Sequence, residues 1–223
     1  DLYFAPTEVS KNNLLMENID ESKIYVTGNT AIDAMKTTVM DNYSHEVLNW
    51  VGNDRLILLT AHRRENLGEP MRHIFRAIKR IVLEYPNVKV VYPIHLNPKV
   101  REVANEVFDG IDRVKLIEPL EVIDFHNFQN KSYIILTDSG GIQEEAPSLG
   151  KPVLVLRDTT ERPEGIQAGT LKLVGTDEET VYKETKKLLD NKNEYEKMSM
   201  ASNPYGDGFA SKYIVDVILE KYK

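Results

Sequence analysis

The sequence YIILTDSGGIQEEAPSLG, residues 133–150, contains the clearest strand, turn and helix signals in this chain of 223 residues. The apolar run at 133–137 predicts a buried strand, and residues 142–149 have helical character. Between them lies a Ser139-Gly140-Gly141 turn. Glycines let backbone N–H groups approach an anion without obstruction by Cβ, and the start of a helix adds unpaired N–H groups and a positive dipole end. The stretch therefore predicts a phosphate-binding strand–turn–helix unit.

Two carboxylates follow this turn. Glu144 and Glu145 lie about one turn into the predicted helix, where a carboxylate can accept hydrogen bonds from ribose hydroxyls, as acidic residues do in dinucleotide-binding folds. Together, the turn and the carboxylates indicate binding of a nucleotide or a nucleotide sugar.

Strand and helix signals alternate through most of the chain. Runs such as 56–59 and 153–156 are apolar at successive positions, which is typical of parallel strands that are buried on both faces. We therefore predict an α/β fold with a doubly wound, Rossmann-like parallel sheet. The predicted strands are residues 55–60, 88–93, 114–117, 133–137, 152–156 and 170–174, and the predicted helices are residues 70–84, 98–108, 122–130, 142–149, 163–167 and 178–189.

The first part of the chain has weaker signals. Thr7 precedes an apolar-periodic stretch and predicts a capped helix. Residues 23–26 predict a strand, and Gly28-Asn29 precede a further helix. We expect residues 41–53 to be a polar connector with Trp50 as its packing anchor.

The end of the chain contains a turn-dense segment, NPYGDG at 203–208, before a final helix. We expect residues 1–223 to form a single nucleotide-binding domain. In this interpretation residues 203–223 are a terminal helix that packs back toward an amino-terminal domain. Because the chain begins at Asp1 without Met, we also expect it to be a fragment cut at a domain boundary.

The composition argues against several classes of protein. There are 28 Lys and Arg residues against 35 Asp and Glu residues, a net charge of −7, which does not suit a nucleic-acid binder. The chain has no Cys and five His without the spacing of zinc ligands, so neither a disulfide framework nor a metal site is expected. No apolar run approaches the roughly 18 residues of a membrane helix. We expect a cytoplasmic protein with no membrane contact.

Polar groups follow several predicted strands, where ligands bind in parallel α/β sheets. His62 and Arg63 come directly after the strand at 55–60, and we favour a ligand role for His62; the alternative is a loop whose arginines pair with nearby glutamates. The segment 157–162 presents two more arginines. Arg157 is equally consistent with a ligand role and with a self-contained turn network, whereas we favour a ligand role for Arg162.

Other histidines carry less information. His95 follows the strand at 88–93, and this position is as consistent with a ligand role as with a place beside a helix cap. We expect His45, His73 and His126 to be surface or packing residues.

Glycine-rich P-loop, G-x-G-x-x-G, G-x-S-x-G and H-E-x-x-H motifs do not occur, which argues against kinases, dehydrogenases, esterases and zinc proteases.

Five ordered motifs together closely resemble the non-hydrolysing bacterial UDP-N-acetylglucosamine 2-epimerases. They are TAHRREN (60–66), YPIHLNP (92–98), TDSGGIQEEAP (137–147), RDTTERPE (157–164) and NPYGDG (203–208). The resemblance covers essentially the whole chain, but it corresponds to the carboxyl-terminal half of such an enzyme. It implies the carboxyl-terminal domain of a glycosyltransferase-B type fold.

The resemblance also implies a reaction. Family members interconvert UDP-N-acetylglucosamine and UDP-N-acetylmannosamine without a cofactor, metal or nicotinamide. The C2 proton is removed while UDP leaves C1, and UDP adds again after reprotonation on the other face. The family supplies precursors for cell-surface polysaccharides.

Matched positions give expected roles for individual residues. Ser139, Gly140 and Gly141 hold phosphate, Glu145 binds the ribose hydroxyls, and Arg162 contacts the nucleotide. His62 is the catalytic candidate beside the diphosphate. The remaining matches are Leu120 and Phe125, which flank uracil, and Arg63 and His95, which are candidates for an allosteric site.

The principal catalytic carboxylates of the family belong to the amino-terminal half, which this sequence does not contain. We therefore expect this chain to bind UDP and UDP-N-acetylhexosamine but not to epimerise alone, and we expect the intact enzyme to be a homodimer. Two alternatives remain open at this point: the nucleotide domain of a UDP-sugar glycosyltransferase, and a non-catalytic nucleotide-sugar-binding module.

Overall fold

A six-stranded parallel sheet forms the centre of the protein in the computed structural model, which describes residues 1–222. The strand order is β5-β4-β3-β6-β7-β8, and every neighbouring pair is parallel. Counted within this sheet, that is the 3-2-1-4-5-6 order of doubly wound dinucleotide-binding folds. The strands are β3 (Arg55–Thr60), β4 (Val88–Pro93), β5 (Val114–Ile117), β6 (Ile134–Thr137), β7 (Val153–Val155) and β8 (Leu171–Leu173).

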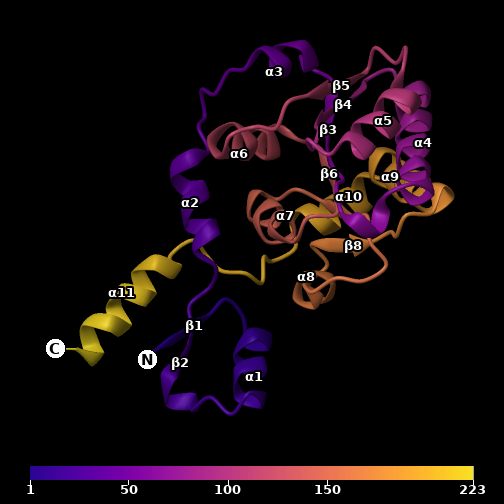
Figure 1. Ribbon diagram of the computed structural model, residues 1–223. Coiled ribbons are helices and arrows are strands. Elements are labelled where there is room, and N and C mark those ends of the chain that lie inside the picture. Colours follow the sequence, from indigo (N-terminus) through magenta and orange to yellow (C-terminus); the bar gives the residue numbers. More distant parts are fainter. Residues whose placement is uncertain (223) are drawn as a thin grey trace.

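Helices cover both faces of this sheet (Figure 1). One face packs against α4 (Glu69–Glu84), α5 (Pro98–Phe108) and α9 (Glu178–Asp190). The other face packs against α3 (Glu46–Val51), α6 (Val122–Lys131) and α7 (Gly140–Glu145). Successive residues of β3 enter the two cores in turn, Leu56 and Leu58 on one side and Ile57 and Leu59 on the other. The central residues of such a strand are apolar at successive positions because both faces are buried. The parallel sheet between two helical layers confirms the predicted α/β class.

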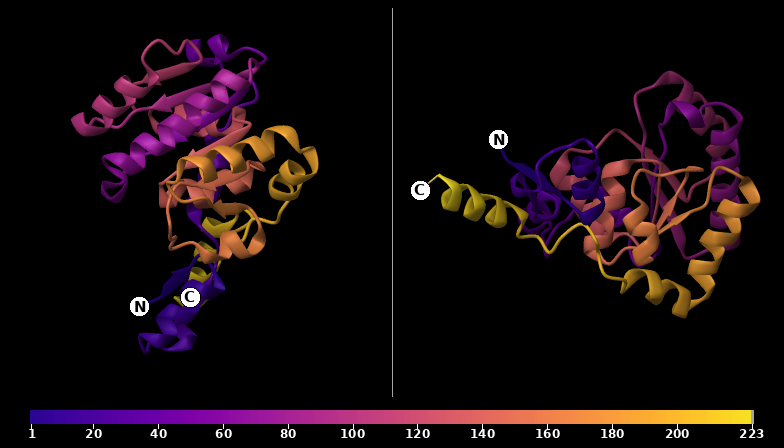
Figure 2. Two further views of the ribbon diagram at one scale, coloured as in Figure 1. Left: turned by 90° about the vertical axis from the view of Figure 1, so that its right-hand side faces the viewer. Right: turned by 90° about the horizontal axis from the view of Figure 1, so that it is seen from below.

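A second, two-stranded sheet lies apart from the first. Strands β1 (Tyr3–Ala5) and β2 (Ile24–Val26) pair in parallel, and α1 (Glu8–Met16) connects them through the short turn η1 (Glu21–Lys23). Helix α11 (Ala210–Lys221) extends beside this small sheet, and α2 (Thr30–Thr38) leads from it to the main body (Figure 2). That residues 1–223 form a single domain stays a prediction.

Two glycines pack against each other where the chain crosses between these parts. Gly28 has φ +86° and Gly206 has φ +125°, conformations that L side chains rarely adopt. A Cβ atom added to Gly28 would lie 3.0 Å from the Gly206 Cα atom. Beside this contact, the Asn29 N–H donates to the Tyr205 carbonyl at 2.7 Å. Glycine is therefore needed here for both conformation and space.

Most predicted elements are confirmed within one or two residues, but two differ, and one helix lies outside the predicted elements. Residues 41–53 are not a simple connector, because they contain α3, which is capped by the His45 ring and buries Val47 and Val51 one turn apart. The helix expected at 142–149 begins earlier as α7 and ends as the 3₁₀ turn η3 (Ala146–Leu149). Helix α10 (Lys192–Ser199) was not predicted; the remaining elements are η2 (Arg64–Asn66) and α8 (Pro163–Ala168).

Candidate functional site

The candidate site lies where the strand order reverses. Strands β3 and β6 are neighbours in the middle of the sheet, but their following helices pack on opposite faces. In open α/β sheets this switch point leaves a crevice at the carboxyl ends of the strands, and ligands bind there. The structure thus brings two predicted segments together, the loop after β3 with His62 and the Ser139-Gly140-Gly141 turn after β6.

A buried carboxylate fixes these two loops to each other. Asp138 is fully buried, and its Oδ2 atom accepts hydrogen bonds from the backbone N–H groups of His62 and Arg63, both at 2.8 Å. The same oxygen accepts from Asn66 Nδ2 at 3.0 Å. Asp138 was not singled out from the sequence, although its position immediately before the glycine turn at a strand end was an available signal.

Two guanidinium groups converge on the turn. A Cβ atom added to Gly140 would lie 3.7 Å from Arg162 Nη2 and 4.0 Å from Arg63 Nη2. Neither Gly140 nor Gly141 has a positive φ, so these glycines provide space and not an unusual backbone conformation. The arrangement suits a phosphate group, because the guanidinium forks and the first N–H groups of a helix all supply donors.

The turn differs from expectation in one respect. The Ser139 N–H donates to the Thr137 hydroxyl at 2.9 Å, so this backbone donor is already used. The Ser139 side chain makes no cap bond to α7. The donors of the turn that could reach an anion are therefore the Ser139 hydroxyl and the N–H groups of Gly140 and Gly141.

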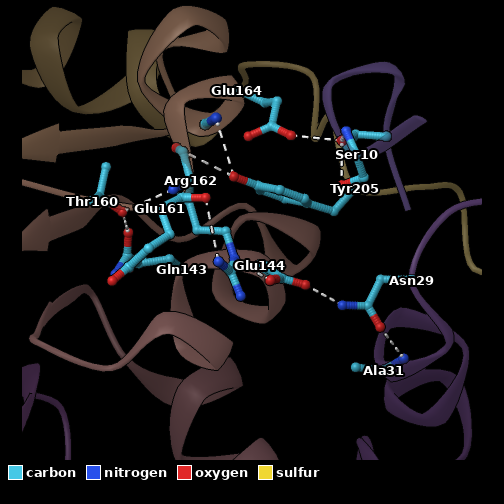
Figure 3. A network of polar contacts seen from close by, with 12 residues as sticks. Ser10, Asn29, Ala31, Gln143, Glu144, Thr160, Glu161, Arg162, Glu164 and Tyr205 are labelled. Atoms are coloured by element: carbon cyan, nitrogen blue, oxygen red, sulfur yellow. Dashed lines mark hydrogen bonds and ion pairs between the residues drawn. The ribbon is translucent and has the colours of Figure 1, made fainter. Parts of the chain in front are cut away.

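Arg162 is held by a network that reaches the first part of the chain (Figure 3). Its Nε atom donates to Glu144, which is 7% exposed, and Glu144 also accepts from the Asn29 side chain at the start of α2. Glu144 thus serves Arg162 and not a ligand. The Tyr205 hydroxyl accepts from the Gly165 N–H at 3.2 Å, and burial raises the pKa of Tyr205, so the phenol stays protonated.

Glu145 lies beside the second glycine of the turn. A Cβ atom added to Gly141 would lie 3.7 Å from Glu145 Oε1. The second oxygen, Oε2, accepts from Gln129 Nε2 at 2.9 Å and lies 3.8 Å from His126 Nε2. His126 is 4% exposed, so the expectation of a surface or packing residue describes its burial but not its contact with Glu145.

His62 and His95 come together at the rim. Their rings stack with centroids 5.3 Å apart, and His62 Nε2 lies 3.9 Å from Asp138 Oδ1, an oxygen without a hydrogen-bond partner among the described residues. The His95 Nδ1 atom accepts from the Asn97 N–H at 3.1 Å, which is the helix-cap position considered from the sequence. Both histidines therefore lie close to the turn that carries Arg63.

The other expected residues are placed as follows. Leu120 and Phe125 are partly buried at the start of α6 and pack against the same core cluster as Ile142 of α7. Arg157 is buried and is paired with Glu161 at 2.7 Å and with Glu65 at 3.2 Å, which favours the self-contained turn network over a ligand role.

The pockets do not all coincide with this chemistry. One pocket, of about 610 Å³, lies between α2, η3 and the loop before α11, and contains none of the converging groups. A pocket of about 150 Å³ adjoins Arg162 and is lined by Thr7, Glu144, Glu161 and Tyr205. Of the groups that converge on the turn, only Arg162 lines this second pocket, and three of its other lining residues are glutamates. We therefore place the candidate site at the Gly140-Gly141 turn itself and not in either pocket.

Within residues 1–222, no group of three or more His, Cys, Asp or Glu side chains is arranged to hold a metal ion. Across the same residues, no helix has the length and hydropathy needed to cross a membrane.

Residues 1–219 match the model of a protein family described as UDP-N-acetylglucosamine 2-epimerase. This chain belongs to that family. A Bacillus subtilis (strain 168) UDP-N-acetylglucosamine 2-epimerase is 68% identical over 222 residues, which are 100% of this chain and 58% of that protein.

Solved structures of the family agree with the fold. The S. aureus MnaA-UDP co-structure has a TM-score of 0.95 and 58% identity, covering 98% of this chain and 60% of that one. The Neisseria meningitidis UDP-GlcNAc 2-epimerase bound to UDP-GlcNAc has a TM-score of 0.90 and 48% identity, covering 98% and 61%. These neighbours confirm the glycosyltransferase-B type fold class. The chain spans about three fifths of the length of the epimerases that it matches.

Proposed function

We propose that this chain is the UDP-binding part of a non-hydrolysing UDP-N-acetylglucosamine 2-epimerase that interconverts the N-acetylglucosamine and N-acetylmannosamine forms. The observation that carries the proposal is the convergence of Arg162 and Arg63 on Gly140 and of Glu145 on Gly141, at the switch point of the sheet. Positive charge beside Gly140 and a carboxylate beside Gly141 suit a diphosphate joined to a ribose. Family membership and the UDP-bound relative support the same ligand.

The proposed reaction has two parts, the departure and return of UDP at C1 and the transfer of the proton at C2. Removal of the C2 proton and cleavage of the C1–O bond give a glycal and UDP, and UDP adds again after C2 is protonated on the opposite face. Arg162 and Arg63 stabilise the charge that develops on the leaving diphosphate. His62 lies next to them with one ring nitrogen toward Asp138, and assists the departure and return of UDP.

The site described here is one wall of the complete site. The pocket of about 150 Å³ beside Arg162 does not include the Gly140-Gly141 turn and is too small to enclose a nucleotide sugar. We infer that the groups that move the C2 proton come from the part of the relatives' length that this chain does not span. A role of Arg63 and His95 in regulation, a homodimeric assembly and a cytoplasmic location stay predictions.

Calorimetric titration with UDP tests the assignment. We expect the chain to bind UDP, and we expect Glu145→Ala and Arg162→Ala each to weaken binding by roughly 10-fold or more, because each removes hydrogen bonds to a charged group. Asp158→Ala, on the exposed side of the same loop, is the matched control. Unchanged affinity in both site variants would contradict the assignment.

A second experiment separates epimerase from glycosyltransferase. The full-length enzyme is incubated with UDP-N-acetylglucosamine and no acceptor. Formation of the epimer supports the proposal, whereas a requirement for an acceptor supports a glycosyltransferase. The 223-residue chain alone is expected to show no turnover, and measurable turnover would contradict our division of the chemistry.

A further inference from the structure

Helix α6 carries an unusual buried polar stripe. His126, Asn127 and Gln129 are 4%, 0% and 0% exposed. Buried polar groups are costly unless they find partners, so each of these side chains should have a definite structural task. The Asn127 side chain hydrogen-bonds to the backbone at the end of α2: it accepts from the Met40 N–H at 2.9 Å and donates to the Thr38 carbonyl at 2.8 Å.

The other two side chains are directed at Glu145. Gln129 Nε2 donates to Glu145 Oε2 at 2.9 Å, and His126 Nε2 faces the same oxygen at 3.8 Å. Both contacts are on Oε2, whereas Oε1 is the oxygen that faces the Gly141 turn. One carboxylate oxygen is thus held by α6, and the other accepts no hydrogen bond within residues 1–222, so it can accept from a ligand.

The far side of the His126 ring faces the end of α2. Its Nδ1 atom lies 2.7 Å from the Thr38 hydroxyl. The Thr38 hydroxyl also lies 2.9 Å from the Ala34 carbonyl, so its proton has two acceptors within reach, and this contact alone does not fix the tautomer of His126. A carboxylate oxygen can only accept, and Nε2 is the ring nitrogen that faces Glu145, so we assign a ring proton to Nε2.

We propose that Gln129 and His126 are positioning residues that hold Glu145 ready for the ribose hydroxyls, so that selectivity for a ribonucleotide depends on α6. The proposal rests on the proposed function, since it takes Glu145 as the ribose-binding group. A glutamate side chain has several rotamers, and ordering it when the ligand binds costs affinity. Holding it beforehand removes that cost, but only for ligands whose sugar hydroxyls reach Oε1.

The test compares UDP with 2′,3′-dideoxy-UDP, which keeps the base and the diphosphate but lacks both hydroxyls. Calorimetry on the 223-residue chain gives the ratio of the two affinities. We expect a preference for UDP of roughly 10- to 100-fold, the range for hydrogen bonds to a charged group. Gln129→Leu and His126→Phe, which replace the hydrogen-bonding groups by apolar side chains of similar shape, should each reduce the preference several-fold while binding of dideoxy-UDP stays within about twofold.

Two further variants separate positioning from packing. His126→Gln restores an N–H near the Nε2 position and should recover most of the preference. Ser132→Ala removes another buried hydrogen bond on α6, the one from the Ser132 hydroxyl to the Phe128 carbonyl at 2.6 Å, without touching Glu145, and should leave the preference unchanged. Urea unfolding identifies which variants retain a cooperative fold, and the conclusion is drawn from those.

Failure of the positioning role of Gln129 and His126 can be told apart from failure of the proposed UDP-binding function. If the unmodified chain does not bind UDP, or if Glu145→Ala keeps the preference, the proposed function or the role of Glu145 fails. If Glu145→Ala abolishes the preference but the folded Gln129 and His126 variants keep it, the positioning proposal alone is overturned. Loss of the preference in Ser132→Ala would also overturn it, because a general disturbance of α6 would then be sufficient.

Discussion

At the scale of single residues, Asp138 connects the loops on which the site depends. Its Oδ2 atom accepts three hydrogen bonds, and all of them come from the loop after β3. Without this carboxylate, His62 and Arg63 would lose the backbone anchors that place their side chains at the turn. A buried donor that loses its charged acceptor lowers the stability of the fold by the full free energy of its desolvation.

We therefore expect Asp138→Ala to lower the free energy of unfolding by about 3–5 kcal/mol, and Asp138→Asn by less because an amide oxygen can still accept. Urea unfolding followed by circular dichroism measures both. The exposed Asp158→Ala should stay within about 0.5 kcal/mol of the unmodified chain. Equal effects at the two positions would contradict the anchoring role.

The Arg157–Glu161 pair gives a pH-dependent prediction. The Arg157 guanidinium, which donates to both Glu161 oxygens, lowers the pKa of Glu161 from 4.5 to about 2. A carboxylate whose folded pKa is lowered contributes stability above its unfolded pKa of 4.5, and that contribution is lost as the pH falls toward 2. Glu161 is 55% exposed, so screening by water limits the contribution to about 1 kcal/mol or less.

Unfolding of the unmodified chain and of Glu161→Gln should therefore differ most at neutral pH. The difference in unfolding free energy should shrink as the pH is lowered from about 7 to about 3. A difference that stays constant over this range would show that the ion pair does not hold the loop.

At the scale of elements, periodicity predicted the main strands well because each is a continuous apolar run between two helical layers. Helix α3 was missed because six residues with His45 as cap are too short to show a helical period. Site residues at strand ends were predictable from their position after a strand. By contrast, His126 and Gln129 were not, because their role depends on α6 packing against α7, which the sequence of α6 alone does not specify.

The crossing of Gly28 and Gly206 is a second feature of this scale. Gly28→Ala combines a positive φ with a clash against backbone, since its Cβ would lie 3.0 Å from Gly206 Cα. Gly169 is a matched control, because its φ of +81° is close to the +86° of Gly28 but nothing lies within 4 Å of its Cβ position. We expect Gly169→Ala to cost about 1 kcal/mol and Gly28→Ala to cost at least about 1 kcal/mol more.

Thermal or urea unfolding of the two variants measures the difference. Because the strain from φ is similar in both, the excess isolates the contact between the crossing segments. If the two variants lose the same stability, the backbone contact at Gly206 has no energetic role.

At the scale of the whole molecule, UDP should stabilise the folded chain by mass action. At a free concentration of about 100 times Kd, binding to the folded state alone contributes about 2.7 kcal/mol. For a protein of this size that corresponds to a rise in Tm of roughly 5–11 °C. Scanning fluorimetry over a UDP concentration series should show this rise, and Arg162→Ala should shift it to higher concentrations; a Tm independent of UDP would contradict binding.

Fold class and family were predictable at this scale, since long ordered motifs survive in the sequence. The arrangement of the small sheet and α11 was not. These parts contact the main body through the Gly28–Gly206 backbone contact and the side-chain hydrogen bond from Asn29 to Glu144, and neither kind of contact has a periodic signal in the sequence.

The central pairing of β3 with β6 also has a kinetic consequence. Thr60 and Thr137 lie side by side at its end but are 77 residues apart in the chain. Pairing of the two strands therefore closes a long loop, and the entropy lost on closure is not offset until most of the intervening elements have formed their contacts. The anion site lies across that pair and cannot exist before it forms. During refolding, the capacity to bind nucleotide should therefore appear after the early helices, and a fluorescent nucleotide would report the joining of the two halves of the sheet.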